Sequence, residues 1–316
     1  MKNIMKLVGV LAAVILLSAC NSSSSDSDDG KGLEVTPTVR SHSHNDYYRD
    51  EPFFGAVNLG FGSFEADVFY REGYEEVLVA HDEWETVFEW SFDDMYIQPL
   101  VQYVRDNEYR FYNNWSHSAV LLIDIKTQID SNDSGYETWL AVEEVLSQYP
   151  DIFTTYENGV VKQGPVTAII SGYRPIEEMR SATKRYSFVD GRLGDLGNET
   201  DPSLMPLISN NFSYFNQPQF GNFFGKGEWP QEALDELDRI VTEAHANNQK
   251  IRFWATPEGN DYINNHIWSE LVKADVDFIN TDHQQQLHDW LLENDPHPSE
   301  PSVNWLDDPF WDPMYP

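Results

Sequence analysis

Residues 120–126 read Val-Leu-Leu-Ile-Asp-Ile-Lys, an apolar run that ends in alternating polar side chains. A short continuous apolar run is typical of a strand that is buried on both faces, as in a parallel sheet covered by helices. Seven other short apolar runs occur along the chain, and stretches with helical periodicity separate most of them. The eight predicted strands span residues 39–44, 63–69, 77–81, 120–125, 166–171, 186–190, 251–254 and 278–281.

The sequence between these strands favours helices that pack around them. Residues 230–246, for example, place five apolar side chains on one helical stripe. Strands that alternate with helices form parallel units, and eight units predict an α/β fold with a single (β/α)8 TIM-type barrel. A doubly wound open sheet is the alternative. Residues 191–227 are long and irregular and contain an alternative sixth strand at 206–210. The predicted helices span residues 137–148, 175–185, 230–246, 266–274 and 284–292.

The N-terminus has the features of an export signal. Lys2 and Lys6 precede an apolar run at 7–17 that is too short for a comfortable membrane span, and Leu-Ser-Ala-Cys closes it at Cys20. This pattern resembles a bacterial lipobox, so we expect Cys20 to be lipidated, with an unmodified thiol in an ordinary secretory signal as the alternative. The predicted location is the bacterial cell envelope, on the periplasmic or outer surface, with the N-terminal lipid as membrane anchor.

The predicted domain organisation follows from these patterns. Residues 1–19 are a lipoprotein signal peptide, and residues 20–36 form a disordered Ser/Asp tether whose composition cannot bury apolar area. Residues 37–295 form the barrel domain. Residues 296–316 are a tail rich in proline and tryptophan that could wrap the barrel.

Charge and cysteine content exclude several classes of function. The chain has 53 acidic residues against 20 lysines and arginines, which gives a formal charge of −33. Nucleic acids and anionic membrane surfaces reward a basic patch, so we predict no nucleic-acid partner. No protein partner is predicted either. A single cysteine allows neither an internal disulfide nor a zinc cage of cysteine and histidine.

Polar side chains stand at the C-terminal ends of the predicted strands. Side chains two residues apart share one face of a strand, so Glu65 and Asp67 point the same way, as do Asp124 and Lys126. The C-terminal ends of parallel barrel strands meet at one mouth, where active sites are built. The further pairs of this kind are His42 with His44, Val79 with His81, and Asn280 with Asp282.

The carboxylates at this mouth point to a metal site. Glu65, Asp67 and Asp124 would repel one another unless a cation neutralised them. They offer only oxygen ligands, which suit Mg²⁺ or Ca²⁺ better than Zn²⁺, so we expect one divalent cation of this kind. Lys126 brings such a site close to neutrality, and it can then receive a phosphate anion. Histidines, with an ordinary pKa of about 6.5, suit proton transfer near neutral pH.

In their order and spacing these motifs resemble the PLC-like phosphodiesterase superfamily, which includes glycerophosphodiester phosphodiesterases and the venom-type sphingomyelinases D. The shared pattern reads here as His44, Glu65-Ala66-Asp67, His81-Asp82 and Asp124-Ile125-Lys126. Within the superfamily the sequence most resembles the "altered inheritance of mitochondria" type of fungi and bacteria. The motifs that carry this resemblance are His-Ser-His-Asn-Asp-Tyr at 42–47 and Arg-Phe-Trp-Ala-Thr-Pro at 252–257.

The resemblance implies roles for individual residues. His44 and His81 would be the catalytic acid and base, and Glu65, Asp67 and Asp124 the metal ligands. The sequence does not decide which histidine is which, and we assign the base to His44. Family precedent implies that a substrate hydroxyl can attack first and give a cyclic phosphate. The residues expected to bind substrate are Lys126, Trp254, His42 and Asn45. Core packing is the alternative for Trp254, and support of a metal ligand is the alternative for His42.

The predicted function is therefore a metal-dependent phosphodiesterase, a phosphoric diester hydrolase acting on a glycerophosphodiester or a phospholipid-type head group. Asn45-Asp46 stands where glycerophosphodiesterases usually have Arg-Gly, which leaves the substrate open. The alternative is a catalytically inactive barrel lipoprotein that serves as a binding or scaffold module of the envelope. A glycoside hydrolase is disfavoured, because its paired carboxylates would not be expected beside a lysine and two histidines.

Overall fold

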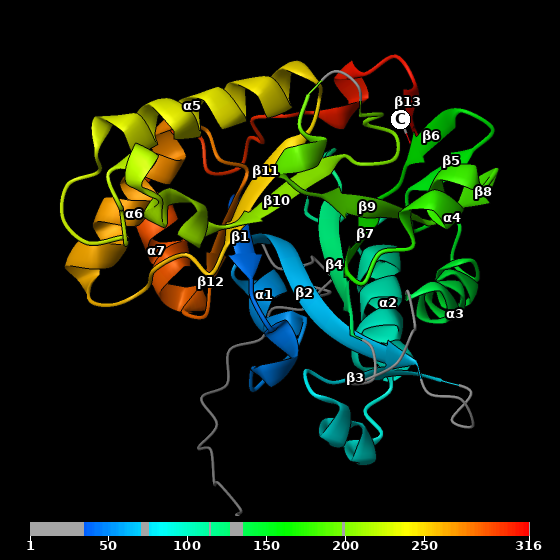
Figure 1. Cartoon of the computed structure of the whole chain (residues 1–316). Coiled ribbons are helices and arrows are strands. Elements are labelled where there is room, and N and C mark those ends of the chain that lie inside the picture. The colour runs from blue at the N-terminus through cyan, green and yellow to red at the C-terminus, as the bar shows by residue number, and fades with distance from the viewer. Residues whose placement is uncertain (1–34, 71–75, 114, 127–134, 198–199, 316) are drawn as a thin grey trace, which may run out of the picture. The chain divides into compact units, whose positions relative to one another are not determined.

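Eight parallel strands form a closed barrel in the computed structural model, which describes residues 35–70, 76–113, 115–126, 135–197 and 200–315. Neighbouring strands follow the order β1, β2, β4, β7, β9, β10, β11 and β12, and β12 pairs in parallel with β1 to close the ring (Figure 1). The TIM-type barrel is confirmed, and the open sheet is wrong because this last pairing leaves no edge. The barrel strands are β1 (Thr38–Ser43), β2 (Phe61–Tyr70), β4 (Ala119–Ile125), β7 (Val166–Gly172), β9 (Ser187–Gly191), β10 (Leu207–Asn211), β11 (Lys250–Trp254) and β12 (Phe278–Thr281).

One predicted strand does not belong to the barrel. The run at 77–81 forms β3 (Val77–Val79), which pairs antiparallel with the end of β2 outside the ring. Its place is taken by β10, at the position of the alternative strand 206–210. The ten-residue β2 is long enough that its last residues can pair with β3. The sequence could not reveal this, because an apolar run does not indicate whether a strand pairs in parallel or antiparallel.

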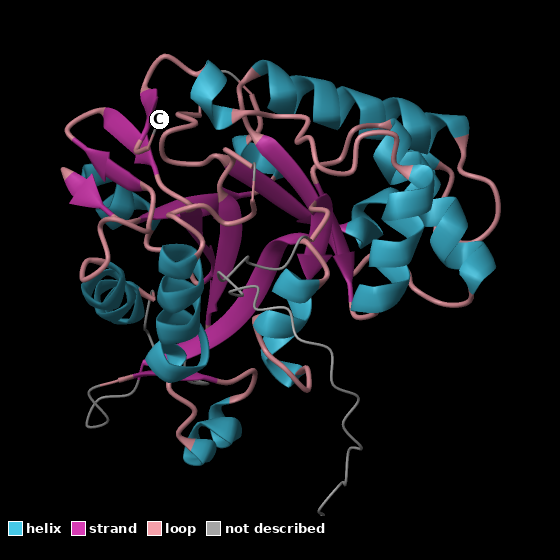
Figure 2. Ribbon diagram, turned by 180° about the vertical axis from the view of Figure 1, so that it is seen from behind, coloured by secondary structure: helices cyan, strands magenta, loops and turns pink. Residues whose placement is uncertain are grey.

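Helices cover the outside of the barrel (Figure 2). The predicted stripe on α5 (Gln231–Ala246) is buried, whereas α2 (Gln98–Asp106) was not predicted. Within the described residues, no helix is long and apolar enough to cross a bilayer. The other helices are α1 (Phe54–Asn58), α3 (Tyr136–Leu146), α4 (Ile176–Ser181), α6 (Asp261–Lys273) and α7 (Gln284–Asn294), with short turns η1 (Asp46–Tyr48), η2 (Glu83–Phe88), η3 (Asp93–Ile97), η4 (Leu193–Asp195), η5 (Phe212–Asn216), η6 (Pro218–Phe220) and η7 (Trp305–Asp307).

The C-terminal tail packs against the N-terminal end of the barrel interior. Val303, Trp305 and Trp311 join one buried cluster with interior side chains such as Leu122 and Phe188. The Lys250 ammonium group donates a hydrogen bond of 2.7 Å to the carbonyl oxygen of Val303. The last strand, β13 (Trp311–Pro313), continues a small sheet with β6 (Val160–Gln163), β5 (Thr155–Glu157) and β8 (Lys184–Arg185).

The two ends of the barrel interior therefore differ in chemistry. Apolar side chains and the tail fill the end where the strands begin, and polar side chains occupy the end where they finish. A TIM-type barrel places its active site at the second of these ends. The predicted signal peptide and Cys20 lie outside the described residues, as does nearly all of the predicted tether.

Candidate active site

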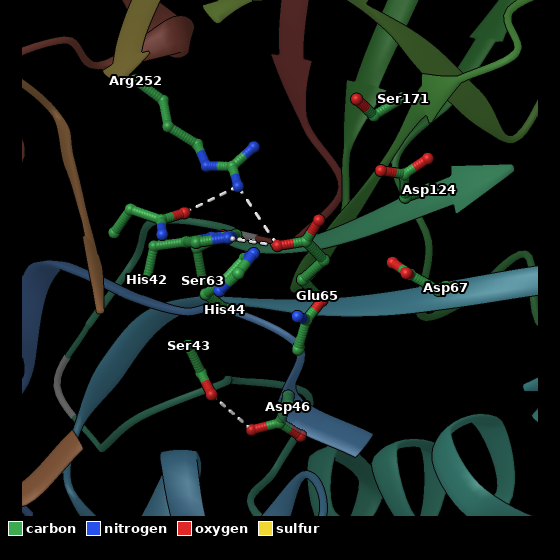
Figure 3. A network of polar contacts seen from close by, with 12 residues as sticks. His42, Ser43, His44, Asp46, Ser63, Glu65, Asp67, Asp124, Ser171 and Arg252 are labelled. Carbon is green, nitrogen blue, oxygen red and sulfur yellow. Dashed lines mark hydrogen bonds and ion pairs between the residues drawn. The ribbon is translucent and has the colours of Figure 1, made fainter. Parts of the chain in front are cut away.

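Three carboxylates meet at the C-terminal mouth of the barrel. Asp67 on β2 pairs in register with Asp124 on β4, and Glu65 lies two residues before Asp67 on the same face. One ligand oxygen from each residue lies within 4.8 Å of the others, an arrangement that could hold a metal ion. Figure 3 shows Glu65 between His42 and Arg252 on one side and the two aspartates on the other. The predicted convergence of these residues is confirmed.

Some of these carboxylate oxygens are buried without a partner. The Oδ1 atoms of Asp67 and Asp124 accept no hydrogen bond within the described part of the chain. Glu65 contacts His42 and Arg252 through Oε2, and its Oε1 atom takes part in neither contact. A buried carboxylate oxygen without a partner is costly, and coordination of a cation removes that cost. The donor set therefore fits a hard divalent ion such as Mg²⁺ or Ca²⁺.

Burial and neighbouring charges shift the pKa values of the three carboxylates in different directions. Burial, followed by repulsion from Glu65 and Asp124, raises the pKa of Asp67 well above its ordinary value. Burial likewise raises the pKa of Asp124. Burial alone would raise the pKa of Glu65, but Arg252 and His42 outweigh it and hold that pKa well below its usual range. A bound cation would therefore stabilise the charged forms of Asp67 and Asp124 more than that of Glu65.

Two cations border the carboxylates. The Lys126 ammonium nitrogen lies 3.1 Å from Oδ2 of both Asp67 and Asp124. The Arg252 guanidinium is almost fully buried and donates to Glu65 at 3.1 Å and to Asn280 at 2.7 Å. Lys126, expected to bind substrate, thus bridges two predicted metal ligands. Together the five charged groups carry a net charge of −1, so a divalent ion would leave +1, which matches the single charge of a phosphodiester.

His42 does not face the substrate, and the structure instead places it in the alternative role beside Glu65. Its side chain is fully buried, with Nδ1 2.8 Å from the Ser63 hydroxyl and Nε2 3.1 Å from Glu65. Burial and then the nearby Arg252 lower the pKa of His42 to about 4. The ring therefore stays neutral near physiological pH and orients Glu65. The alternation along β1 could not reveal how deeply the ring is enclosed.

His44 is only partly buried, and its Nδ1 lies 3.1 Å from Oδ1 of Asp282. The same Asp282 oxygen accepts a hydrogen bond of 2.6 Å from Arg49. The His44 hydrogen bond, with Arg49 adding to it, lowers the pKa of Asp282 to about 2. A carboxylate that holds Nδ1 fixes the ring and leaves Nε2 for proton transfer. Asp282 therefore holds the His44 ring in place.

His81 lies in the turn after β3, not at the end of a barrel strand. Its side chain is 45% exposed, and Glu85 holds its backbone. Glu85 accepts hydrogen bonds from the backbone N–H groups of His81 at 2.8 Å and Asp82 at 3.0 Å. The other Glu85 oxygen accepts a hydrogen bond of 2.7 Å from the Tyr48 hydroxyl. This contact ties the turn that carries His81 to the segment that follows His44.

The remaining predicted site residues differ in their surroundings. The Asn45 side chain accepts a hydrogen bond from Tyr47, whose hydroxyl also donates to Asp67 at 2.9 Å. Asp46, next in sequence, is fully buried and accepts hydrogen bonds from Ser43 and from the backbone of Phe53, so it fixes the loop after β1. Trp254, at the end of β11, is 39% exposed and is therefore not core filler.

Three residues of the site were given no role from the sequence. Arg252 and Tyr47 stand in quoted motifs but were assigned no part in the site, and Glu85 was not considered. The alternation on β11 puts Arg252 on the face of Trp254, which is a signal that could have found it. Glu85 depends on a turn whose path the sequence does not show.

Comparisons with known proteins show the family of the chain. A family model described as the AIM6-like phosphodiesterase domain matches residues 32–190, which is half of the chain. The chain belongs to this family. The predicted resemblance to the "altered inheritance of mitochondria" branch is thereby confirmed, and so is a phosphodiesterase-like domain.

Curated relatives extend the similarity beyond the matched half. "Altered inheritance of mitochondria protein 6" of Eremothecium gossypii is 25% identical over 293 residues, which cover 84% of this chain and 74% of that protein. The homolog from Arthroderma benhamiae is 28% identical over 278 residues, covering 81% and 83%. The protein from Lachancea thermotolerans is 26% identical over 290 residues, covering 81% and 66%.

These relatives overturn the predicted location. All three are fungal proteins whose name refers to the inheritance of mitochondria, and they point to a eukaryotic protein rather than a lipoprotein of the bacterial envelope. The prediction relied on residues 1–20 alone. A basic start, an apolar run and one cysteine make a short pattern that can arise in other contexts.

Proposed function

We propose that this protein is a metal-dependent phosphodiesterase that cleaves a glycerophosphodiester or a phospholipid-type head group. The observation that carries the proposal is the buried, oxygen-only site of Glu65, Asp67 and Asp124 with two partnerless Oδ1 atoms. Lys126 and Arg252 flank this site, and His44, held at Nδ1 by Asp282, stands beside it. Family membership supports the same reaction class.

In this proposal Glu65, Asp67 and Asp124 hold one Mg²⁺ or Ca²⁺. When bound, the ion supplies Lewis-acid polarisation of the phosphoryl group. Lys126 and Arg252 add positive charge where negative charge develops on the phosphoryl oxygens. His42 keeps Glu65 oriented, as partners of metal-binding groups commonly do.

The histidines move the protons. His44, held at Nδ1 by Asp282, takes at Nε2 the proton of the attacking hydroxyl, either water or a neighbouring hydroxyl of the substrate. The new P–O bond forms as the bond to the leaving oxygen breaks. His81 gives its proton to that leaving alkoxide, so charge and protons balance over the step. Attack by a substrate hydroxyl would yield a cyclic phosphate first.

Single histidine variants test this division of labour. His44→Ala and His81→Ala should each lower kcat by roughly 10²- to 10⁴-fold on an alkyl diester such as glycerophosphocholine. On bis(p-nitrophenyl) phosphate, whose leaving group needs no proton, His81→Ala should recover most of its rate and His44→Ala should not. The exposed His297, whose side chain is 67% accessible, provides the matched control, and His297→Ala should keep the wild-type rate.

Two results would count against the proposal. Wild-type rates for both variants on every diester that the protein cleaves would remove the histidines from the mechanism. A wild-type protein that turns over no diester with Mg²⁺, Ca²⁺ or Mn²⁺ would instead support the non-catalytic binding module.

A further inference from the structure

The η2 segment, Glu83–Phe88, exposes its apolar side chains and buries two of its polar ones. Trp84, Val87 and Phe88 are 62%, 64% and 50% exposed, whereas Glu85 and Thr86 are 7% and 1% exposed. A segment of a soluble protein normally shows the opposite pattern. The inversion arises because Glu85 is drawn inward by Tyr48 and by the turn that carries His81.

Four exposed apolar side chains of this stretch, here called the aromatic patch, are Trp84, Val87, Phe88 and Trp90. The Phe88 ring lies 6.0 Å from that of Trp84 and stacks at 5.1 Å on Trp90, which is itself 38% exposed. In Figure 1 the segment projects beyond β3, away from the barrel. A projecting cluster of exposed aromatic side chains marks a surface that docks on something else.

The segment that carries the aromatic patch is tied through Glu85 to the turn of His81 and to the segment after β1. Glu85, within the same short segment, binds the Tyr48 hydroxyl, and the Tyr48 ring lies 6.5 Å from that of His81. Tyr48 is itself 48% exposed. The patch and the turn of His81 therefore belong to one short stretch of chain that Glu85 fixes.

We propose that the aromatic patch docks on the surface of a zwitterionic phospholipid bilayer, such as one of phosphatidylcholine. Tryptophan and other aromatic side chains favour the interfacial layer of a bilayer, where an apolar ring and a polar edge are both accommodated. The charges around the patch select among lipids. Asp82, whose side chain is 61% exposed, and the exposed Glu89 would repel an anionic bilayer.

The same carboxylates complement a choline head group. Its outermost part is a quaternary ammonium cation, which aromatic faces and carboxylates attract together. The formal charge of −33 on the whole chain also repels an anionic bilayer, as Asp82 and Glu89 do. Docking would bring lipid phosphodiesters to the mouth. That use rests on the proposed phosphodiesterase function, whereas the docking itself does not.

Flotation with lipid vesicles tests the docking. The full chain, treated with a chelator so that no turnover occurs, should float with phosphatidylcholine vesicles, and phosphatidylglycerol added to them should weaken binding. Trp84→Ser/Phe88→Ser should lower the partition coefficient between vesicles and water by roughly tenfold or more. The variant lacks the two aromatic side chains that would be transferred from water into the bilayer interface. Tyr262→Ser/Phe310→Ser is the matched control, since these residues are 63% and 61% exposed elsewhere, and it should bind like the wild type.

The outcomes separate docking from catalysis. Failure of the wild type to float, or equal binding by the patch variant, overturns the docking even if soluble diesters are cleaved. Binding that is lost in the patch variant supports it even if no diester is cleaved. Sedimentation velocity gives a further check, because a wild-type dimer that becomes a monomer in the patch variant would show that a second copy covers the patch and would overturn the proposal.

Discussion

Glu85 is the residue on which the position of His81 depends. Its carboxylate accepts the backbone N–H groups of His81 and Asp82 and the hydroxyl of Tyr48, and it is almost fully buried. Hydrogen bonds to a charged acceptor are stronger than those to a neutral amide. Glu85→Gln should therefore loosen the turn and lower kcat on alkyl diesters about tenfold, with KM and metal affinity unchanged.

The kinetic signature distinguishes positioning from a general loss of stability. If Glu85 acts through His81, Glu85→Gln should lose less rate on nitrophenyl diesters than on alkyl diesters, and the limb of the pH–rate profile that reports the general acid should change. Glu89→Gln, at an exposed position just beyond the same segment, should behave like the wild type. An equal loss on both substrates would contradict this account.

The site shows which residues can be predicted from strand alternation and which cannot. Glu65, Asp67 and Asp124 were found because they sit two apart, or in register, at the ends of strands. The burial of His42 was missed because alternation gives a direction but no depth. Glu85 was missed because its partners come from separate segments and depend on the path of a turn.

Strands could be predicted in number and approximate position but not in pairing. Seven of the eight predicted runs lie in the barrel, and the eighth became β3 on the outer edge of β2. β10 was harder to assign, since it lies within a long stretch rich in glycine, asparagine and phenylalanine. Both errors concern which strands are neighbours, a property that pairing across the closed barrel decides.

The C-terminal tail should stabilise the barrel, because its tryptophans pack against side chains of the barrel interior. Trp311 is 3% exposed and stacks on Phe188 at 5.5 Å and on Trp305 at 5.2 Å. Trp311→Ala should lower the free energy of unfolding by about 3–5 kcal/mol, as deletion of a buried aromatic side chain usually does. Urea denaturation measures this change.

An adjacent residue provides the control for the tail. Phe310 is 61% exposed, so Phe310→Ala should change the free energy of unfolding by less than about 0.5 kcal/mol. Metal affinity should be the same in both variants, because the tail packs at the end of the barrel opposite the carboxylates. A small loss in Trp311→Ala, equal to that in Phe310→Ala, would mean that the tail lies on the barrel without stabilising it.

The charge of the whole molecule contrasts with the charge of its mouth. The chain carries −33 overall, yet Lys126 and Arg252 flank the three carboxylates and Arg49 binds Asp282 nearby. One divalent ion would turn the local charge of the five groups from −1 to +1. An acidic protein can in this way receive a phosphodiester at one place while it repels polyanions elsewhere.

The central claim is that Glu65, Asp67 and Asp124 form a single site for a hard divalent ion. Isothermal titration calorimetry of chelator-treated protein with Mg²⁺ and Ca²⁺ tests it most directly. We predict one ion per chain for the wild type, a gain in thermal stability that grows with ion concentration, and loss of both in Asp67→Asn and Asp124→Asn. The absence of binding to the wild type, or unchanged binding in both variants, would contradict the account.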